Sequence, residues 1–222
     1  MAPTQRPVRA RTDPIGQRAP EVIRILREAY PGATVALHFT NPLEILIATI
    51  LSAQCTDVKV NEVTATLFVK YRTPEDYVRV PEDELRADIK PTGFYNQKAA
   101  SIRATCQRVI EVYDGQVPDT MEELRTLRGV ARKTANIVLA NGFGKVEGIP
   151  VDTHVKRLSN RIGFSSQTDP DKIEQDLMRL VPREEWSPFS YVLIDHGRRI
   201  CQAKKPRCTE CPIEPLCPSS QA

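Results

Sequence analysis

The 222-residue sequence predicts an all-α protein, on the strength of three observations. Apolar residues recur at helical spacing in one segment after another, and no segment alternates polar and apolar residues as a half-buried strand does. Residues that favour helix starts precede most of these segments, and Gly or Pro follows their ends. The connections are short, without a repeat of solenoid period. We therefore expect about ten short helices with short connections.

The first predicted helices include the most apolar one. A helix begins at Pro20 and stops before Pro31-Gly32. The next opens with Asn41-Pro42-Leu43-Glu44, a capping signature with Pro at the first helical position. It leads into the run LEILIATILSAQ, which is apolar enough to predict a buried central helix. Asp57 begins another helix.

Three more helices follow in the first half of the chain. Thr73-Pro74 and Pro81-Glu82 start two short ones. Residues 96–113 place their apolar side chains on one stripe and stop at Asp114-Gly115, which predicts a long amphipathic helix.

The second half begins with a helical hairpin. A capping box at Asp119-Thr120-Met121-Glu122 starts a helix that leads through Leu124 to Leu127. A second helix runs from about Arg132 to Ala140, and the tight turn 128–131 joins the two. Three later helix starts lie at Asp152, Asp169-Pro170 and Ser187-Pro188, the last helix running to Ile200.

The basic excess of the chain lies at its N-terminus. The net charge is +3, and residues 1–18 contain four arginines and one aspartate, so the remainder is about neutral. Rich in Pro and Arg and without helical periodicity, residues 1–18 are expected to form a disordered basic tail, with a transit peptide as the weaker alternative. No apolar run approaches the roughly 20 residues that span a bilayer, and no secretion signal is evident. We expect a cytoplasmic protein with no membrane partner.

Four of the six cysteines form a compact array near the C-terminus. Cys201, Cys208, Cys211 and Cys217 have the spacing C-x6-C-x2-C-x5-C in a polar, Pro-rich segment, which makes four core cysteines a poor explanation. Both zinc and a [4Fe–4S] cluster accept four thiolates. Zinc ribbons usually show two C-x2-C pairs, so the spacing favours iron–sulfur over zinc. Cys55 and Cys106 lie on apolar helix faces and are expected to be small buried hydrophobes.

The hairpin turn carries a lysine at the start of its second helix. The segment Leu127–Ala135 reads LRGVARKTA. Such a turn exposes backbone N–H groups at a helix N-terminus, where a phosphate can bind independently of sequence. Alone, the segment is better explained as a surface hairpin whose basic residues are solvated.

Taken together, these motifs resemble the endonuclease III family of base-excision DNA glycosylases. The hairpin, the segment V-D-T-H at 151–154 and the cysteine array are joined by LSAQCTD at 51–57 and GFYNQKA at 93–99. The resemblance spans approximately residues 20–217, in order and with few gaps. Five motifs in register are highly specific. The resemblance implies that the cysteines hold one [4Fe–4S] cluster.

The resemblance also implies a two-lobed helical fold with a DNA-facing cleft between the lobes. Residues 35–147 form a six-helix lobe that contains the helix-hairpin-helix, at about 119–140. Residues 19–34 and 148–222 form the lobe that carries the iron–sulfur cluster.

The activity that the resemblance implies is that of a bifunctional DNA glycosylase and abasic-site lyase. Its partner is double-stranded DNA with a damaged base, typically an oxidised pyrimidine of the thymine glycol type, or with an abasic site. The nucleotide is flipped out because its glycosidic bond is unreachable in the stack. Lys133 matches the catalytic nucleophile of the family. That lysine forms a Schiff base with the sugar, which permits strand cleavage by β-elimination. Asp152 matches the catalytic carboxylate, and its context is equally that of a helix N-cap.

Further residues are assigned to the DNA or to the surroundings of the catalytic pair. Gln54 matches the family residue that fills the space of the flipped nucleotide, and Phe94 matches an apolar wedge that enters beside the orphaned base. Without the resemblance, Gln54 would be interpreted as a helix-end amide and Phe94 as a partly buried aromatic. His154 and Asp57 are expected to support the catalytic groups from outside the substrate. The remaining expected DNA contacts are Arg128, Gly129, Val130, Ala131 and Arg132 in the hairpin, and Lys204, Lys205 and Arg207 in the cysteine segment.

The hairpin departs from the usual family turn, L-P-G-V-G-R-K-T-A, at two positions. Arg128 replaces Pro, and Ala131 replaces the second Gly. If Ala131 must adopt a positive φ, the strain costs on the order of 1 kcal/mol and displaces Lys133. We therefore expect an enzyme of reduced or narrowed activity.

Three rival interpretations remain. A monofunctional adenine glycosylase of the same superfamily acts without a nucleophilic lysine, which Lys133 argues against. A catalytically weak damage-binding protein would keep every motif and lose only turnover. A sequence-specific helix-turn-helix regulator fits poorly, because no recognition helix with several base-reading side chains is present and no dimerisation segment is evident. The expected state is a monomer.

Overall fold

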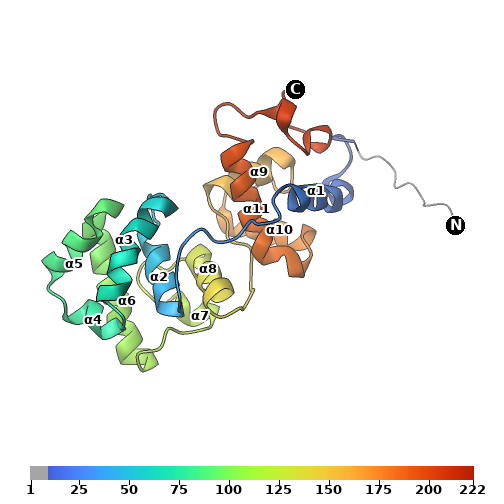
Figure 1. Ribbon diagram of the computed structural model, residues 1–222. Helices are drawn as coiled ribbons and strands as arrows, with labels where there is room; N and C mark the ends of the chain where they lie inside the picture. The colour runs from blue at the N-terminus through green and yellow to red at the C-terminus, as the bar shows by residue number, and fades with distance from the viewer. Residues whose placement is uncertain (1–9) are drawn as a thin grey trace. The chain divides into compact units, whose positions relative to one another are not determined.

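A computed structural model of the chain describes residues 10–222 (Figure 1). These residues form eleven α-helices and four 3-10 helices, and they contain no strand. The all-α fold class predicted from the sequence is therefore confirmed. Within the same residues, no helix combines the length and the apolar character needed to cross a membrane.

The chain divides into two compact units. We call Val35–Glu147 the central lobe. The terminal lobe combines Met1–Thr34 with Gly148–Ala222, and the structure describes it from residue 10 onward. The central lobe contains α2 (Pro42–Leu51), α3 (Asp57–Lys70), α4 (Pro74–Arg79), α5 (Glu82–Ile89), the 3-10 helix η1 (Lys90–Thr92), α6 (Tyr95–Tyr113), α7 (Met121–Leu124) and α8 (Arg132–Gly142). The terminal lobe contains α1 (Ile15–Ala29), α9 (Thr153–Ile162), α10 (Pro170–Leu180), η2 (Arg183–Glu185), α11 (Trp186–Arg199), η3 (Cys208–Glu210) and η4 (Glu214–Leu216).

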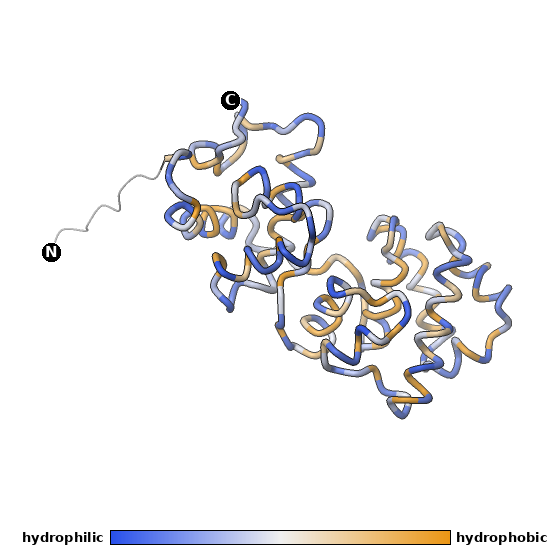
Figure 2. Tube along the Cα trace, turned by 180° about the vertical axis from the view of Figure 1, so that it is seen from behind, coloured by the Kyte–Doolittle hydropathy of each residue, from blue (hydrophilic) through white to orange (hydrophobic). Residues whose placement is uncertain are grey.

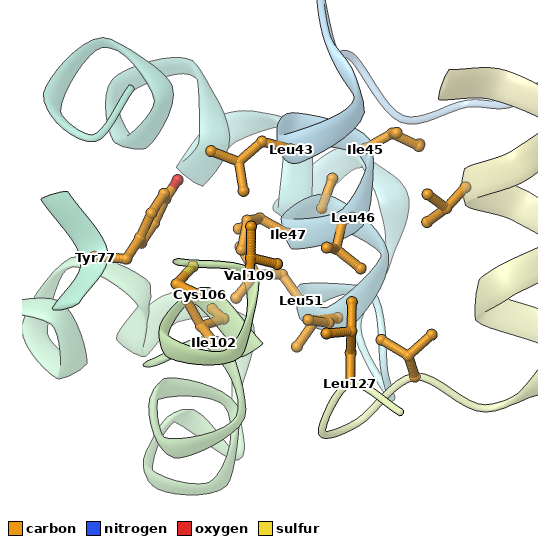
Figure 3. Packing of buried hydrophobic residues seen from close by; sticks show 14 of the residues in the cluster. Leu43, Ile45, Leu46, Ile47, Leu51, Tyr77, Ile102, Cys106, Val109 and Leu127 are labelled. Atoms are coloured by element: carbon orange, nitrogen blue, oxygen red, sulfur yellow. The ribbon is translucent and has the colours of Figure 1, made fainter. Parts of the chain in front are cut away.

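The core of the central lobe is built around α2. The Asn41 side chain caps this helix by accepting a hydrogen bond from the Glu44 N–H at 3.0 Å, as its capping signature predicts. Eight of its ten residues are buried, which confirms the predicted central helix. It packs against α3, α6 and α8, and Figure 3 shows its side chains among those of Ile102, Cys106 and Val109 from α6. Each fully buried aliphatic side chain contributes roughly 1.5–3 kcal/mol to stability.

The two cysteines outside the C-terminal array lie in this lobe. Cys106 is fully buried, and burial raises the pKa of its thiol to about 12, so it acts as a small hydrophobe. Cys55 is only partly buried and packs against the edge of the same core. The expectation of burial is therefore confirmed for Cys106 and is too strong for Cys55.

The terminal lobe has a separate core. Helices α1, α9, α10 and α11 bury apolar faces that include Val22, Leu158 and Leu193, and Phe164 meets Phe189 edge to face at 5.6 Å between ring centroids. Figure 2 shows polar and apolar residues mixed along the helices of both lobes, as expected for amphipathic helices with one face inward.

The N-terminal segment corrects the predicted tail of residues 1–18. Residues 1–9 lie outside the described residues, but α1 begins at Ile15, before Pro20, where the sequence predicted its start. Arg18 is 4% exposed, and its guanidinium donates to the Asp13, Ile162 and Leu216 carbonyls at 2.7, 3.2 and 2.6 Å. These bonds order the segment from inside the lobe, a long-range cause that local periodicity does not reveal.

Two other helix boundaries differ slightly from the prediction. Helix α7 ends at Leu124, and the chain continues to Leu127 in tighter turns, with the Leu127 N–H donating to the Leu124 carbonyl at 3.1 Å. Helix α11 begins at Trp186, before the predicted start at Ser187-Pro188. Pro188 is tolerated there because N–H groups in a first turn have no acceptor within the helix.

Candidate functional site

The hairpin turn of the central lobe joins α7 to α8 and depends on one glycine. Gly129 has a φ of +85°, a conformation that L side chains rarely adopt. A Cβ added there would lie 3.3 Å from the Ser101 Cβ of α6, so the turn also needs a residue without a side chain for packing. Val130 is buried beside it and anchors the turn to the core. Arg128 is exposed, and its carbonyl accepts a hydrogen bond from the Thr105 hydroxyl at 2.8 Å.

Ala131 does not strain the turn, which corrects the sequence-based expectation. Its φ of −85° and ψ of 172° are extended angles that any residue adopts, and it serves as the N-cap of α8. The second glycine of the family turn is therefore not required by a left-handed conformation at this position. The expected reduction in activity depended on that strain and has no support in the backbone of the hairpin.

Lys133 is the second residue of α8 and is exposed. Among the described residues, no side chain caps this helix start, and its first turn contains no acidic residue. Arg132 precedes the lysine and is partly buried. A helix N-terminus with adjacent cations favours binding of an anion such as a phosphate.

Gln54 and Phe94 are displayed on strained turns of the same lobe. They are two of the three non-glycine residues with positive φ in the described chain, at 51° and 48°. Each such conformation costs on the order of 1–3 kcal/mol, which the surrounding structure must hold in place. Phe94 is 57% exposed, so the alternative of a partly buried aromatic is wrong. Both residues line one cavity of about 200 Å³ together with Gly129.

One face of α6 holds all three of these turns. Lys98, Ser101 and Thr105 follow one another at helical i, i+3, i+7 spacing. The Lys98 ammonium donates to the Leu51 and Thr92 carbonyls, each at 2.8 Å, while Thr105 holds the hairpin through Arg128. Sequence analysis did not identify this face as functional, because its three polar residues lie beside the apolar stripe predicted for this helix and are not part of it. Lys98 within the GFYNQKA motif was the available signal.

Asp57 starts α3, as its position in the sequence predicts. The cap itself is Thr56, whose hydroxyl oxygen accepts a hydrogen bond from the Lys59 N–H at 3.3 Å. Asp57 is partly buried in the first turn, where a carboxylate is favoured by the helix dipole.

Asp152 lies in the terminal lobe and caps α9. Its Oδ1 accepts a hydrogen bond from the Val155 N–H at 2.8 Å, and the residue is partly buried. The bond confirms the N-cap interpretation and fixes the direction of the carboxylate. Two residues later, His154 Nδ1 lies 3.1 Å from an Arg157 Nη2 that also donates to the Cys201 carbonyl at 3.1 Å.

Gly197 allows α11 to approach α9 closely at this point. A Cβ added to Gly197 would lie 2.8 Å from His154 Nδ1, closer than real Cβ atoms come to a neighbour, and 3.0 Å from Arg157 Nη2, which is unusually tight. The glycine is therefore required for the packing that places His154 and Arg157. Its role follows from tertiary contact, which sequence analysis did not detect.

The four cysteines of the C-terminal array line one cavity of about 250 Å³. All are free thiols and partly buried. Within residues 10–222, no group of three His, Cys, Asp or Glu side chains is arranged to hold a single metal ion. The thiolates around one tetrahedral zinc lie about 3.8 Å apart, as Zn–S bonds of about 2.3 Å require. A four-iron cluster binds each thiolate at a separate corner and needs the wider spacing of a lined cavity.

The surroundings of the thiols also fit a cationic group. Burial raises the pKa of the Cys211 thiol to about 11 and shifts the pKa of Cys217 in the same direction. Thiolates therefore form here only when a positive centre offsets the burial. Donors already surround the sulfurs: Arg161 Nη1 lies 3.4 Å from Cys201 Sγ, and His196 Nε2 lies 3.5 Å from Cys211 Sγ.

The basic loop between the first two of these cysteines is held by its backbone. Arg161 donates to the Gln202 and Ala203 carbonyls at 2.8 and 2.7 Å. Lys204 and Lys205 are exposed on this loop. Arg207 is exposed as well, but it pairs with Glu210 at 3.0 Å and donates to the Arg199 carbonyl. Lys204 and Lys205 are thus the more accessible cations of the three predicted there.

Comparisons with known proteins agree with this architecture. Residues 47–183 match the HhH-GPD superfamily of base excision DNA repair proteins. Endonuclease III of Synechocystis sp. is 52% identical over 206 residues, covering 93% of this chain and 94% of the relative. Endonuclease III of Bacillus subtilis is 48% identical over 195 residues, covering 87% of this chain and 89% of the relative.

Solved structures agree as well. A non-covalent endonuclease III–DNA complex matches with a TM-score of 0.89 at 44% identity, covering 93% of this chain and 96% of the other. A trapped endonuclease III–DNA covalent intermediate, the estranged-adenine complex, matches with the same score and identity. The fold and the hairpin thus define a helix-hairpin-helix protein of the HhH-GPD superfamily. Within this superfamily, the chain belongs to the endonuclease III family.

Proposed function

We propose that the protein is a bifunctional DNA glycosylase and abasic-site lyase that acts on oxidised pyrimidines, of the thymine glycol type, in duplex DNA. One observation carries the proposal. Lys133 stands exposed at the uncapped start of α8 in a chain 44% identical to a protein that has been trapped covalently on DNA. The enzyme acts as a monomer in the cytoplasm, bound at the nucleoid through its DNA.

The reaction follows from the chemistry of a lysine amine. The Lys133 Nζ attacks C1′ of the flipped nucleotide; a C–N bond forms while the glycosidic bond breaks, and the base leaves with the bonding electrons. One proton passes from this nitrogen to the departing base. The C1′–O4′ bond then breaks, the ring oxygen takes up a proton, and C1′ and the nitrogen form a protonated Schiff base. Loss of a C2′ proton then expels the 3′ phosphate by β-elimination. Asp152 stabilises the cationic sugar in the transition state and assists proton transfer.

Other side chains open and hold the duplex. Gln54 occupies the space that the flipped nucleotide leaves, and Phe94 enters beside the orphaned base as an apolar wedge. Their left-handed backbone and shared cavity support this role. His154 and Asp57 support the catalytic pair from outside the substrate. Phosphate contacts come from the hairpin, Arg128 to Arg132, and from the basic loop with Lys204, Lys205 and Arg207.

The four cysteines of the terminal lobe hold one [4Fe–4S] cluster. The cavity that the four free thiols line supports this choice. When bound, the group joins distant parts of a segment that is poor in apolar residues and so shapes the basic loop.

Borohydride trapping tests the proposed function. Duplexes with one thymine glycol or one abasic site are incubated with the protein and borohydride, which reduces a Schiff base to a stable adduct. We expect an adduct on both substrates with the wild type and none with Lys133→Gln. A wild type that binds these duplexes but forms no adduct would identify a damage-binding protein instead.

A further inference from the structure

Lys98 on α6 is a buried cation that pairs with no carboxylate among the residues that the structure describes. Its side chain is 4% exposed, and burial lowers its pKa. A buried ammonium is unfavourable unless polar groups replace its water. Here its Nζ donates to two backbone carbonyls at 2.8 Å, those of Leu51 and Thr92.

The two carbonyls belong to the last residues of two different helices. Leu51 ends α2, and Thr92 ends η1. Carbonyl groups at helix ends lack intrahelical partners and carry the negative end of the dipole, so an ammonium satisfies both ends at once. Lys98 therefore joins two segments that are about 40 residues apart in the sequence.

Each of these helix ends leads directly into one of the strained turns. Gln54 follows Leu51 by three residues, and Phe94 follows Thr92 by two. Left-handed backbone at a non-glycine residue persists only where the surrounding structure holds it. The Lys98 ammonium binds the helix end before each of these two turns, and Lys98 lines the cavity that Gln54 and Phe94 share.

We propose that Lys98 is a positioning residue that sets the spacing between Gln54 and Phe94, so that both side chains enter the duplex together at the flipped nucleotide. The proposal deepens the proposed function and depends on it. Lys98 is not a second nucleophile, because its amine is buried and bound to two carbonyls. It acts on the duplex only through the two turns.

Comparison of duplex with single-stranded abasic DNA tests this role. A single strand has no partner base to displace, so its cleavage needs Lys133 but not the two inserted side chains. We expect Lys98→Met to slow cleavage of the duplex by roughly 10- to 100-fold and to leave the single-strand rate within about 2-fold. Lys98→Gln keeps N–H donors on a shorter, uncharged side chain and should lie between Lys98→Met and the wild type.

A spectroscopic measurement reports the insertion itself. 2-Aminopurine placed opposite a stable abasic analogue becomes more fluorescent when it is unstacked. We expect the wild type to raise its fluorescence on binding and Lys98→Met to lose most of this rise at saturating protein. Lys90→Met is the matched control, because it removes one exposed positive charge from the same short helix, η1, and should behave as the wild type.

The possible outcomes are distinct. Equal duplex rates for Lys98→Met and the wild type would overturn the inference, as would an equal fall in the duplex and single-strand rates, which indicates a general structural role. If Lys98→Met does not fold by circular dichroism, Lys98→Gln supports or overturns the inference by the same two rates. A wild type inactive on both abasic substrates would instead refute the proposed function.

Discussion

The two lobes hold their functional segments by different means. In the central lobe, three turns rest on one face of α6, which itself packs on the apolar helix α2. In the terminal lobe, the segment 201–222 contributes Ile213 and Leu216 to the buried core, and arginines hold its carbonyls. A large core can hold strained turns rigidly, whereas a segment with so little apolar surface depends on polar anchors and on the cofactor that we propose. The comparison predicts that the lobes respond differently to substitution.

The largest expected loss of activity comes from substituting the proposed catalytic residue of each lobe, Lys133 in the central lobe and Asp152 in the terminal lobe. Lys133→Gln should lower abasic-site cleavage by at least roughly 1000-fold, because it removes the amine that we propose forms the covalent bond. Asp152→Asn should lower base excision by roughly 100-fold and keep some adduct. Asn caps helices as well as Asp does, so this variant retains the α9 cap and isolates the charge. Single-turnover kinetics on thymine glycol DNA measure both, and equal losses for the two variants would contradict the division of roles.

The next effect tests the anchoring of the terminal lobe. Cys211→Ser should abolish the visible absorbance of the purified protein and expose residues 201–222 to trypsin, because a cluster ligand is lost. The central lobe should remain protected from the protease. Cys55→Ser is the control, since this cysteine is partly buried outside the array. Mass spectrometry of the fragments gives the result. Equal visible absorbance of Cys211→Ser and the wild type would show that Cys211 is not a ligand of the proposed cluster.

A smaller effect distinguishes the two small residues of the hairpin. Gly129→Ala should destabilise the protein by about 1–2 kcal/mol and slow cleavage, because an L residue is strained at a φ of +85° and would crowd Ser101. Ala131→Gly should leave cleavage unchanged and lower stability by about 0.4–1 kcal/mol, through the greater freedom of the unfolded chain. Urea unfolding and duplex cleavage rates measure both. Faster cleavage by Ala131→Gly would revive the idea of a strained turn.

The smallest effect concerns a helix cap far from these turns. In α4, the Asp76 side chain accepts hydrogen bonds from the Arg72 and Thr73 N–H groups, both at 2.9 Å. These bonds lower its pKa from 3.8. A lowered pKa means that the stabilisation is present above 3.8 and is lost as the pH falls through the folded-state pKa. Asp76→Asn should therefore have a lower urea midpoint at neutral pH and approach the wild type in strong acid. A difference independent of pH would show that the charge plays no part.

Much of the architecture could be predicted from local pattern. The caps at Asn41 and Asp152 were predicted correctly because a cap bonds within three residues of itself, whereas the cap of α7 is Thr120, one residue after the predicted box begins. The first helix start was wrong because Arg18 is held by carbonyls about 144 and 198 residues away. The strain expected at Ala131 was wrong because the sequence of a turn does not by itself assign a left-handed residue.

In the candidate site, too, some features follow from local sequence and others only from tertiary contacts. Lys133, Asp152 and the cysteine array belong to motifs that the chain displays in linear order, so the sequence by itself identified the family and its chemistry. Only the tertiary structure decided that Gly129, Gln54 and Phe94 share one cavity and that Lys98 joins two of their turns. The physical reason is that a buried cation satisfies helix ends distant in sequence, and no local pattern encodes which carbonyls fold to meet it.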